Sequence, residues 1–340
     1  MEIFAMKTPI SWIIDDPAPI VSVYYEVMDN PITLDGRPLI PTYPNEALFA
    51  FCDIIERYGI RGKFSVVPMP GNRGDIINGV EGGSREELDA WLDCVKKRVM
   101  PAFSVGPEML THNKAVDLET GAALSLNERD WASTQDRTTL VPYISKALSL
   151  LKKAGLSSIG VTSPWNFGIE VEDEYEHSIS RAVEQVTGSK KAWFFLRGLR
   201  DTPNAKPWIA LEEDGRTLVS IPATLRDNIW QTIDTMRSDD EYISEVADVI
   251  ITADGKNGTL MRVLETGGYP ILITHWQSLM SNGLYTGLKV MDEIAARISR
   301  NLSDRVEWMS FEEITDMVLE NKENLHRIIS IALTAVTALP

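Results

Sequence analysis

The sequence lacks the residues that mark several common classes of protein. It contains only two cysteines, Cys52 and Cys94, and neither belongs to a Cys-x-x-Cys pair. This excludes a zinc ribbon and a disulfide scaffold, so both thiols are expected to be small buried groups. No Gly-x-Gly-x-x-Gly follows the first strand-like run, and the glycine-rich stretch from Gly71 to Gly83 is not followed by Lys-Ser or Lys-Thr. Both absences argue against a dinucleotide-binding fold and against a phosphate-binding loop.

An excess of positive charge is also missing. The 340 residues include 49 acidic and 33 basic side chains, which gives a formal net charge of −16. Such a chain is poorly suited to bind nucleic acid or an anionic membrane surface. The charge says little about a neutral substrate such as a sugar.

Targeting signals and long apolar runs are absent as well. The first eleven residues lack the basic region and apolar core of a signal peptide, and no uncharged apolar run could span a bilayer. We therefore expect a cytoplasmic location. The apolar C-terminal tail, residues 326–340, is too short to span and is expected to pack as a terminal helix or to support a homo-oligomer.

What the sequence does contain is a regular alternation of strand-like apolar runs and amphipathic helical segments. Ser84 with Glu87 and Ser310 with Glu313 have the spacing of a capping box, and Gly155 stands where a helix should end. Strands are predicted at 10–14, 62–67, 102–110, 158–162, 191–196, 217–221, 270–274 and 306–309, with helices at 45–58, 85–99, 138–154, 172–186, 239–252, 258–265, 287–299 and 311–320.

This alternation predicts an α/β fold in which crossover helices join parallel strands, either closed into a barrel or doubly wound. No linker rich in proline, glycine or serine divides the chain, so residues 1–325 are expected to form a single domain. The proline-rich segment Asp29–Pro44 should run as a long excursion over one face, either as a lid or as an inert insertion.

The most informative stretch is an apolar run that ends in two adjacent carboxylates and a proline, Asp15-Asp16-Pro17. Neighbouring side chains on a strand point to opposite faces, so two aspartates inside it would force a charge into the core. At the end of the strand both can turn toward a cleft, because Pro17 interrupts the ladder. Such paired acids can divide labour, one holding a cation and the other moving a proton, or they can simply open a polar turn.

Two of the four histidines, His112 and His275, directly follow strand-like runs, whereas His177 and His326 lie in helical segments and are expected to be solvated or packed. Residues just past the strand ends line the functional face of a parallel barrel, so the two histidines should meet the Asp15-Asp16 pair there. Imidazole and carboxylate together suit zinc or another divalent transition metal. A second carboxylate could then take a proton from water while a histidine protonates the leaving group, which is the chemistry of amide or ester hydrolysis.

Other side chains share this placement after a strand. Trp165, beside a proline, could stack on a sugar ring or pack a loop, and Arg197 and Arg226 could hold a catalytic aspartate ionised or be ordinary surface cations. Further candidates for substrate contact are Asn166, Asp227, Trp230 and Trp276, with Glu108 as a supporting or turn-capping carboxylate.

The order of these motifs resembles the polysaccharide deacetylase superfamily, the NodB-like carbohydrate esterases of family 4. The family's first motif is an Asp-Asp pair after the first strand, and the resemblance implies that Asp15 is the general base and Asp16 a metal ligand. Its aliphatic-x-His motif is matched at Ile273-Thr274-His275, with His275 as the general acid, and an Asp-x-x-Trp motif is matched at Asp227 and Trp230. The implied fold is a deformed (β/α) barrel of about seven strands.

The second motif of the family departs here. It is His-Ser/Thr-x-x-His with both histidines on the metal, but His112 supplies only the first because Val116 occupies the second position. Asp117 is the expected replacement ligand, and Glu108 is the alternative. The third motif places an arginine before Pro-aromatic; Pro164-Trp165 keeps the latter half without the arginine, which Arg197 or Arg226 would have to replace.

The resemblance therefore implies a metal-dependent hydrolase that removes an acetyl group or cleaves a small amide on a carbohydrate-type substrate. Zinc is the expected cofactor, with nickel or cobalt as further candidates. Two other hypotheses remain open. One is a hydrolase of a small non-sugar amide, and the other is a catalytically silent carbohydrate-binding protein on the same fold.

Overall fold

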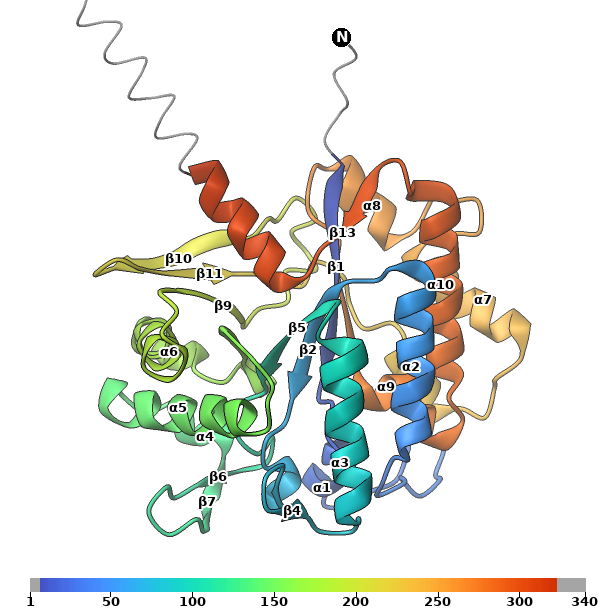
Figure 1. Ribbon diagram of the computed structural model, residues 1–340. Coiled ribbons are helices and arrows are strands. Elements are labelled where there is room, and N and C mark those ends of the chain that lie inside the picture. The colour runs from blue at the N-terminus through green and yellow to red at the C-terminus, as the bar shows by residue number, and fades with distance from the viewer. Residues whose placement is uncertain (1–6, 323–340) are drawn as a thin grey trace, which may run out of the picture.

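The computed structural model describes residues 7–322 and places parallel strands at the centre of the molecule (Figure 1). A five-stranded sheet has the order β12-β1-β2-β5, with β13 (Val306–Trp308) paired to the start of β1, and a four-stranded sheet has the order β10-β11-β9-β8. The principal strands are β1 (Thr8–Asp15), β2 (Gly62–Val66), β5 (Phe103–Pro107), β8 (Gly160–Thr162), β9 (Lys191–Phe195), β11 (Arg216–Ser220) and β12 (Ile271–His275).

Contacts at both edges join the two sheets into one deformed barrel. A parallel bridge between Glu108 and Thr162 links the end of β5 to β8. On the other side, the backbone N–H groups of Thr224 and Leu225, just after β11, donate to Ile271 O on β12 at 3.0 and 3.3 Å. Seven parallel strands therefore surround a common interior, and the predicted barrel is confirmed.

Helices cover the outside of the barrel because each has one apolar face (Figure 1). In α2 the buried positions are spaced one helical turn apart, with Ala47 and Leu48 followed by Phe51 and Cys52. The main helices are α2 (Asn45–Tyr58), α3 (Arg85–Cys94), α5 (Arg137–Lys153), α6 (Glu172–Thr187), α7 (Asp240–Ile250), α8 (Thr259–Glu265), α9 (Trp276–Met280) and α10 (Thr286–Leu302), and residues 311–322 are also helical.

The central strand positions the first functional residues. β1 pairs with β12 on one side and β2 on the other, and Ile10 to Ile14 are buried on both faces. Asp15, its last residue, lies in register with His275, the last residue of β12. The chain then turns sharply at Asp16, whose φ of 65° is left-handed, a conformation that aspartate tolerates better than most residues. The Asp15 carboxylate and the His275 imidazole therefore come from adjacent positions at the ends of neighbouring strands.

The structure also contains short elements that the sequence did not predict. β10 (Trp208–Glu213) pairs antiparallel with β11 and is largely half-exposed. The others are a two-strand hairpin formed by β3 (Gly74–Asp75) and β4 (Gly79–Val80), a second formed by β6 (Lys114–Val116) and β7 (Ala123–Asn127), and the helices α1 (Val23–Val27) and α4 (Glu128–Ala132). The two hairpins and the two helices have two to five residues per element and carry no periodic apolar pattern that could mark them.

Several further expectations concern particular segments. Cys52 and Cys94 are buried and unpaired as predicted, with their sulfur atoms 3.7 Å apart. Residues 29–44 run largely as a loop, which Arg37 ties down by donating to Ile233 O at 2.7 Å. Within residues 7–322 no helix has the length and apolar character needed to cross a membrane. The predicted apolar tail, residues 326–340, lies outside the described residues.

Candidate active site

Most of the predicted residues meet in one cavity of about 680 Å³ at the carboxyl ends of the barrel strands. Its volume lies in the range of small-molecule sites. Of the predicted residues, those that line it are Asp15, Asp16, Glu108, His112, Trp165, Asn166, Arg226, Asp227, Trp230 and His275.

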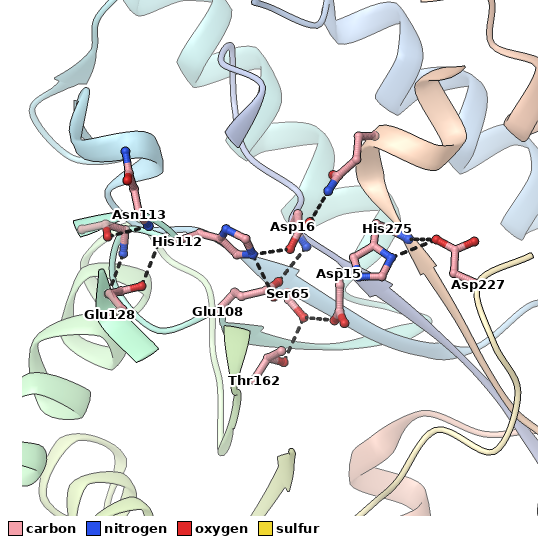
Figure 2. A network of polar contacts seen from close by, with 12 residues as sticks. Asp15, Asp16, Ser65, Glu108, His112, Asn113, Glu128, Thr162, Asp227 and His275 are labelled. Carbon is pink, nitrogen blue, oxygen red and sulfur yellow. Dashed lines mark hydrogen bonds and ion pairs between the residues drawn. The ribbon is translucent and has the colours of Figure 1, made fainter. Parts of the chain in front are cut away.

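Asp16, Glu108 and His112 form a buried group of ligand-type side chains whose donor atoms all lie within 4.8 Å of one another. Figure 2 shows them pointing toward one another. Asp16 Oδ1 lies 2.9 Å and Glu108 Oε1 3.8 Å from His112 Nε2. Donors around a tetrahedral zinc ion with bonds of about 2.0–2.1 Å are roughly 3.3 Å apart, so this spacing fits a metal site.

The charges of this group also fit a cation. Burial raises the pKa of Glu108 well above its ordinary value, and the charges of Asp16 and Asp15 raise it further. Burial alone would raise the pKa of Asp16, but the adjacent His112 holds it below its ordinary value. Asp16 Oδ1 is buried and accepts no well-directed hydrogen bond within residues 7–322, although His112 Nε2 lies 2.9 Å away. A divalent cation would supply the positive charge that two buried carboxylates need.

The loop that carries His112 is held by another buried carboxylate, Glu128, at the start of α4. Its oxygens accept the backbone N–H groups of residues 110–112 at 3.0, 3.0 and 2.8 Å and the Tyr143 hydroxyl at 2.7 Å. This bonding stabilises the left-handed backbone of His112, whose φ is 51°. Glu128 therefore orients His112 without belonging to the group of ligand-type side chains itself.

Asp15 lies beside the group formed by Asp16, Glu108 and His112 and is paired with a buried lysine. Lys63 Nζ on β2 donates to Asp15 Oδ1 at 2.5 Å, to Thr162 Oγ1 at 2.6 Å and to Ser65 Oγ. The Lys63 side chain is fully buried, and these three acceptors satisfy its three N–H donors inside the barrel. The pair balances the charge of a carboxylate that would otherwise stand alone in the interior.

Lys63→Met is expected to destabilise the fold, because the Asp15 carboxylate would be left buried without its cation. Removing one partner of a buried ion pair costs about 3–5 kcal/mol, which denaturant unfolding followed by circular dichroism would measure. The double variant Lys63→Met/Asp15→Asn removes the stranded charge as well and should recover part of the loss. A double variant no more stable than the single one would show that charge balance is not what Lys63 provides.

His275 and His112 lie on either side of the Asp15–Asp16 pair (Figure 2). Asp227 Oδ2 accepts from the backbone N–H of His275 at 3.0 Å and contacts its Nδ1 at 2.9 Å. Burial would lower the pKa of His275, but the hydrogen bond to Asp227 and the nearby carboxylate charges raise it to about 9. The ring is therefore protonated at neutral pH, and Nε2 is the nitrogen left to exchange a proton.

An indole ring makes an edge-to-face contact with each of the two imidazoles. The Trp165 and His112 ring centroids are 4.3 Å apart, and those of Trp230 and His275 are 5.1 Å apart. Trp165 is 40% exposed and has a left-handed φ of 48°, so the backbone holds a large apolar ring at the surface of the cavity. Such walls suit a ring-shaped substrate.

The prediction that Asp117 is a metal ligand is wrong. Its Oδ1 accepts from the backbone N–H groups of Glu119 and Thr120 at 2.9 and 2.8 Å, within the turn between β6 and β7. The carboxylate is thus used to close that hairpin and does not line the cavity. Glu108, the alternative, lies beside Asp16 and His112.

The structure also corrects the expectations for Trp276 and the two arginines. The Trp276 ring packs in the core, with centroids 5.8 Å from Phe51 and 5.9 Å from Phe64, and is no substrate contact. Arg197 pairs with Glu172, and Arg226 lies 3.7 Å from Asp201, so neither supplies the missing cation beside Asp15. The cation beside Asp15 is Lys63.

Two residues of the site were missed from the sequence, Lys63 and Glu128. Gln277, whose Nε2 donates to Asp16 Oδ2, follows His275 by two residues. The signal for Lys63 was present, because Lys63 and Ser65 alternate with apolar residues on a strand and must share one face. No sequence signal distinguishes Glu128 from a surface carboxylate.

Comparison with known proteins locates the fold. No protein-family profile matches this sequence, and no curated protein matches it. A solved structure assigned as a polysaccharide deacetylase from Mycobacterium smegmatis is similar with a TM-score of 0.50, at 12% identity, over 81% of this chain and 78% of that one. The Xyl-CE4 domain of a multidomain xylanase from the hindgut metagenome of Trinervitermes trinervoides aligns at 10% identity over 92% of this chain and 91% of its own, with a TM-score of 0.44. The first of these likenesses, together with the seven-stranded barrel, shows that the chain has the NodB-like polysaccharide deacetylase fold, in a highly divergent sequence.

Proposed function

We propose that this protein is a metal-dependent hydrolase that removes an acetyl group, or cleaves another small amide, on a carbohydrate-type substrate. The observation that carries the proposal is the single cavity in which Asp15 and His275 flank the group formed by Asp16, Glu108 and His112 (Figure 2). The fold supports the class of enzyme, and residues up to 325 would form one catalytic domain.

Each side chain has a distinct task in this proposal. Asp16, Glu108 and His112 would hold a divalent cation, zinc by the donor set with nickel or cobalt as alternatives, and that cation would act as a Lewis acid on the substrate carbonyl. Asp15 would take a proton from the attacking water. His275 would give its proton to the leaving nitrogen or oxygen as its bond to the acetyl carbon breaks. The products are acetate and the free amine or alcohol.

The shape of the cavity bears on the substrate. A volume of about 680 Å³, with Trp165 and Trp230 standing against the two imidazoles, suits one or two sugar rings. We therefore favour a monosaccharide or short oligosaccharide over the interior of a long polymer.

Acetate release from N- and O-acetylated mono- to tetrasaccharides tests this proposal. The metal-loaded protein should release acetate, lose this activity with a chelator and regain it with added zinc, nickel or cobalt. Turnover of small non-sugar amides but of no saccharide would instead favour the small-amide hydrolase. If metal-loaded protein releases nothing from either class, the hydrolase proposal is wrong.

A catalytically silent carbohydrate-binding protein is the second candidate, favoured by one specific observation. Asp16 Oδ1 and His112 Nε2 are 2.9 Å apart, close enough to form an ion pair with no metal between them. Burial would lower the pKa of His112, but Asp16 raises it above its ordinary value, which favours the charged partner. Purified protein that is metal-free and still binds sugars would support this candidate.

His275→Ala should slow turnover by about 10²–10⁴-fold while leaving the metal content close to that of the wild type, because it removes a proton donor and no ligand. The pH profile gives a second measurement. Because the pKa of His275 is raised to about 9, the acid form is present at neutral pH and wild-type activity should fall as pH rises through about 9. The variant should lack that fall. Loss of metal in His275→Ala would make His275 a ligand instead.

A further inference from the structure

Three arginines line the site cavity or the smaller cavity that adjoins it. Arg200 follows β9, Arg226 follows β11, and Arg262 lies on α8; we call them the arginine cluster. Arg200 and Arg226 line the site cavity itself. All three line a smaller adjoining cavity of about 220 Å³, which shares Arg200, Leu225 and Arg226 with the larger one. The cluster therefore faces the space in which the substrate would lie.

The cluster has little internal neutralisation. Among residues 7–322, Asp201 is the one carboxylate within 4.0 Å of Arg200 or Arg226, at 4.0 and 3.7 Å, and its side chain is 85% exposed. Arg262 donates to the backbone oxygen of Arg200 at 3.2 Å, which positions that segment. By contrast, Arg98 reaches a carboxylate at 2.6 Å, as does Arg297.

With Asp201 as its one nearby carboxylate, the arginine cluster has a local excess of positive charge in a chain whose net charge is −16. The same cavity is also lined by the carboxylates of Asp16 and Glu108, which belong to a separate group with His112. The contrast in charge between the arginines and these carboxylates would orient a substrate that carries an anionic group. Arginine forks bind carboxylate and phosphate oxygens well. Apolar side chains of the same cavity, including Leu196, Leu225 and Ile273, would cover the sugar ring.

We propose that the substrate is an acetylated sugar that carries an anionic group, a carboxylate or a phosphate, which Arg200 and Arg226 bind while the acetyl group lies at Asp16, Glu108 and His112. This inference rests on the proposed function and goes beyond it by naming the substrate class. Arg262 acts as a positioning residue for the segment of Arg200.

Three ligands that differ only at one carbon test the inference: N-acetylglucosamine, its 6-phosphate and its 6-carboxylate. Their dissociation constants are measured by calorimetry on metal-loaded Asp15→Asn protein, which should not consume them. At low salt at least one anionic sugar should bind about tenfold or more tightly than the neutral one, and high salt should reduce that ratio. The two anions show whether the group is phosphate or carboxylate.

Substitutions in and beside the arginine cluster should change the ratio of anionic to neutral affinity in opposite directions. Arg200→Gln and Arg226→Gln, made in the same background, should bring the ratio of anionic to neutral affinity toward one. Asp201→Asn removes the competing carboxylate and should raise the ratio, a gain that misfolding cannot produce. Arg300→Gln, an exposed arginine at the end of α10, removes the same charge elsewhere and should leave the ratio unchanged.

The results separate this inference from the proposed function. Acetate release by the wild type with equal affinity for all three sugars would overturn the anionic-substrate inference and leave the hydrolase standing. A ratio that depends on Arg200 and Arg226 without any acetate release would support the anion site and contradict the hydrolase. If none of the three sugars binds, the inference is wrong.

Discussion

Asp15→Asn should abolish turnover, by about 10²–10⁴-fold or more, while the protein retains its metal. The amide has nearly the shape of the carboxylate and can still accept a hydrogen bond from Lys63, but it cannot take a proton from water. Acetate release and metal content, measured on the same preparation, check both halves of this expectation.

Asp117→Asn is the matched control for this substitution. The sequence had named Asp117 as a ligand, and the structure places it in the β6–β7 turn, so this variant should keep both metal and activity. An active Asp15→Asn protein would reject Asp15 as the base. A metal-free one would instead make Asp15 part of the ligand set.

Glu108→Gln should lower zinc affinity by more than about 100-fold and remove activity with it, because it takes away one of the three proposed protein ligands. Glu128→Gln provides the comparison: it loosens the loop of His112 without removing a ligand, so a smaller loss of about 10–100-fold is expected. Competition with a coloured chelator would measure both affinities. Equal, small losses in the two variants would show that Glu108 does not bind the metal.

The same site predicts how zinc affinity depends on pH. In the absence of metal, burial and neighbouring carboxylates raise the pKa of Glu108, and the pKa of His112 is raised by Asp16 despite its burial. Both groups must lose their protons to bind a cation. Apparent zinc affinity should therefore increase as pH rises, and Glu108→Gln should reduce this dependence.

Much of the fold could be predicted because the barrel strands are short apolar runs separated by long amphipathic helices. The strand from Thr8 to Asp15 illustrates this: its apolar side chains are buried on both faces, and only its end carries charge. The same reasoning placed Asp15, His112 and His275 at one edge, because parallel strands end on the same side of a barrel.

What could not be predicted depends on the direction in which the chain turns after a strand. Met109 and His112 both have left-handed backbones, with φ of 41° and 51°, and this turn brings Glu108 back beside the imidazole. Sequence spacing alone made Asp117 the expected ligand and Glu108 the alternative. Trp276 was misplaced for a related reason: a helix begins directly after His275, so the indole points into the core against Phe51 and Phe64.

The replacement for the missing arginine shows another limit. Arg197 and Arg226 were reasonable choices because they follow strands, as functional residues in barrels do. The cation beside Asp15 instead comes from within a strand, where Lys63 points into the barrel and is saturated by Asp15, Ser65 and Thr162. The alternation of Lys63 and Ser65 with apolar residues marks a polar face on this strand, but it does not say which carboxylate the lysine meets.

Anomalous diffraction at the zinc edge, from crystals of protein supplied with stoichiometric zinc, examines the shared cation most directly. One strong peak should appear within about 2.0–2.2 Å of an oxygen of Asp16, an oxygen of Glu108 and Nε2 of His112. A map with no peak there, in which the aspartate and the imidazole still touch each other directly, would contradict the metal centre and the hydrolase built on it.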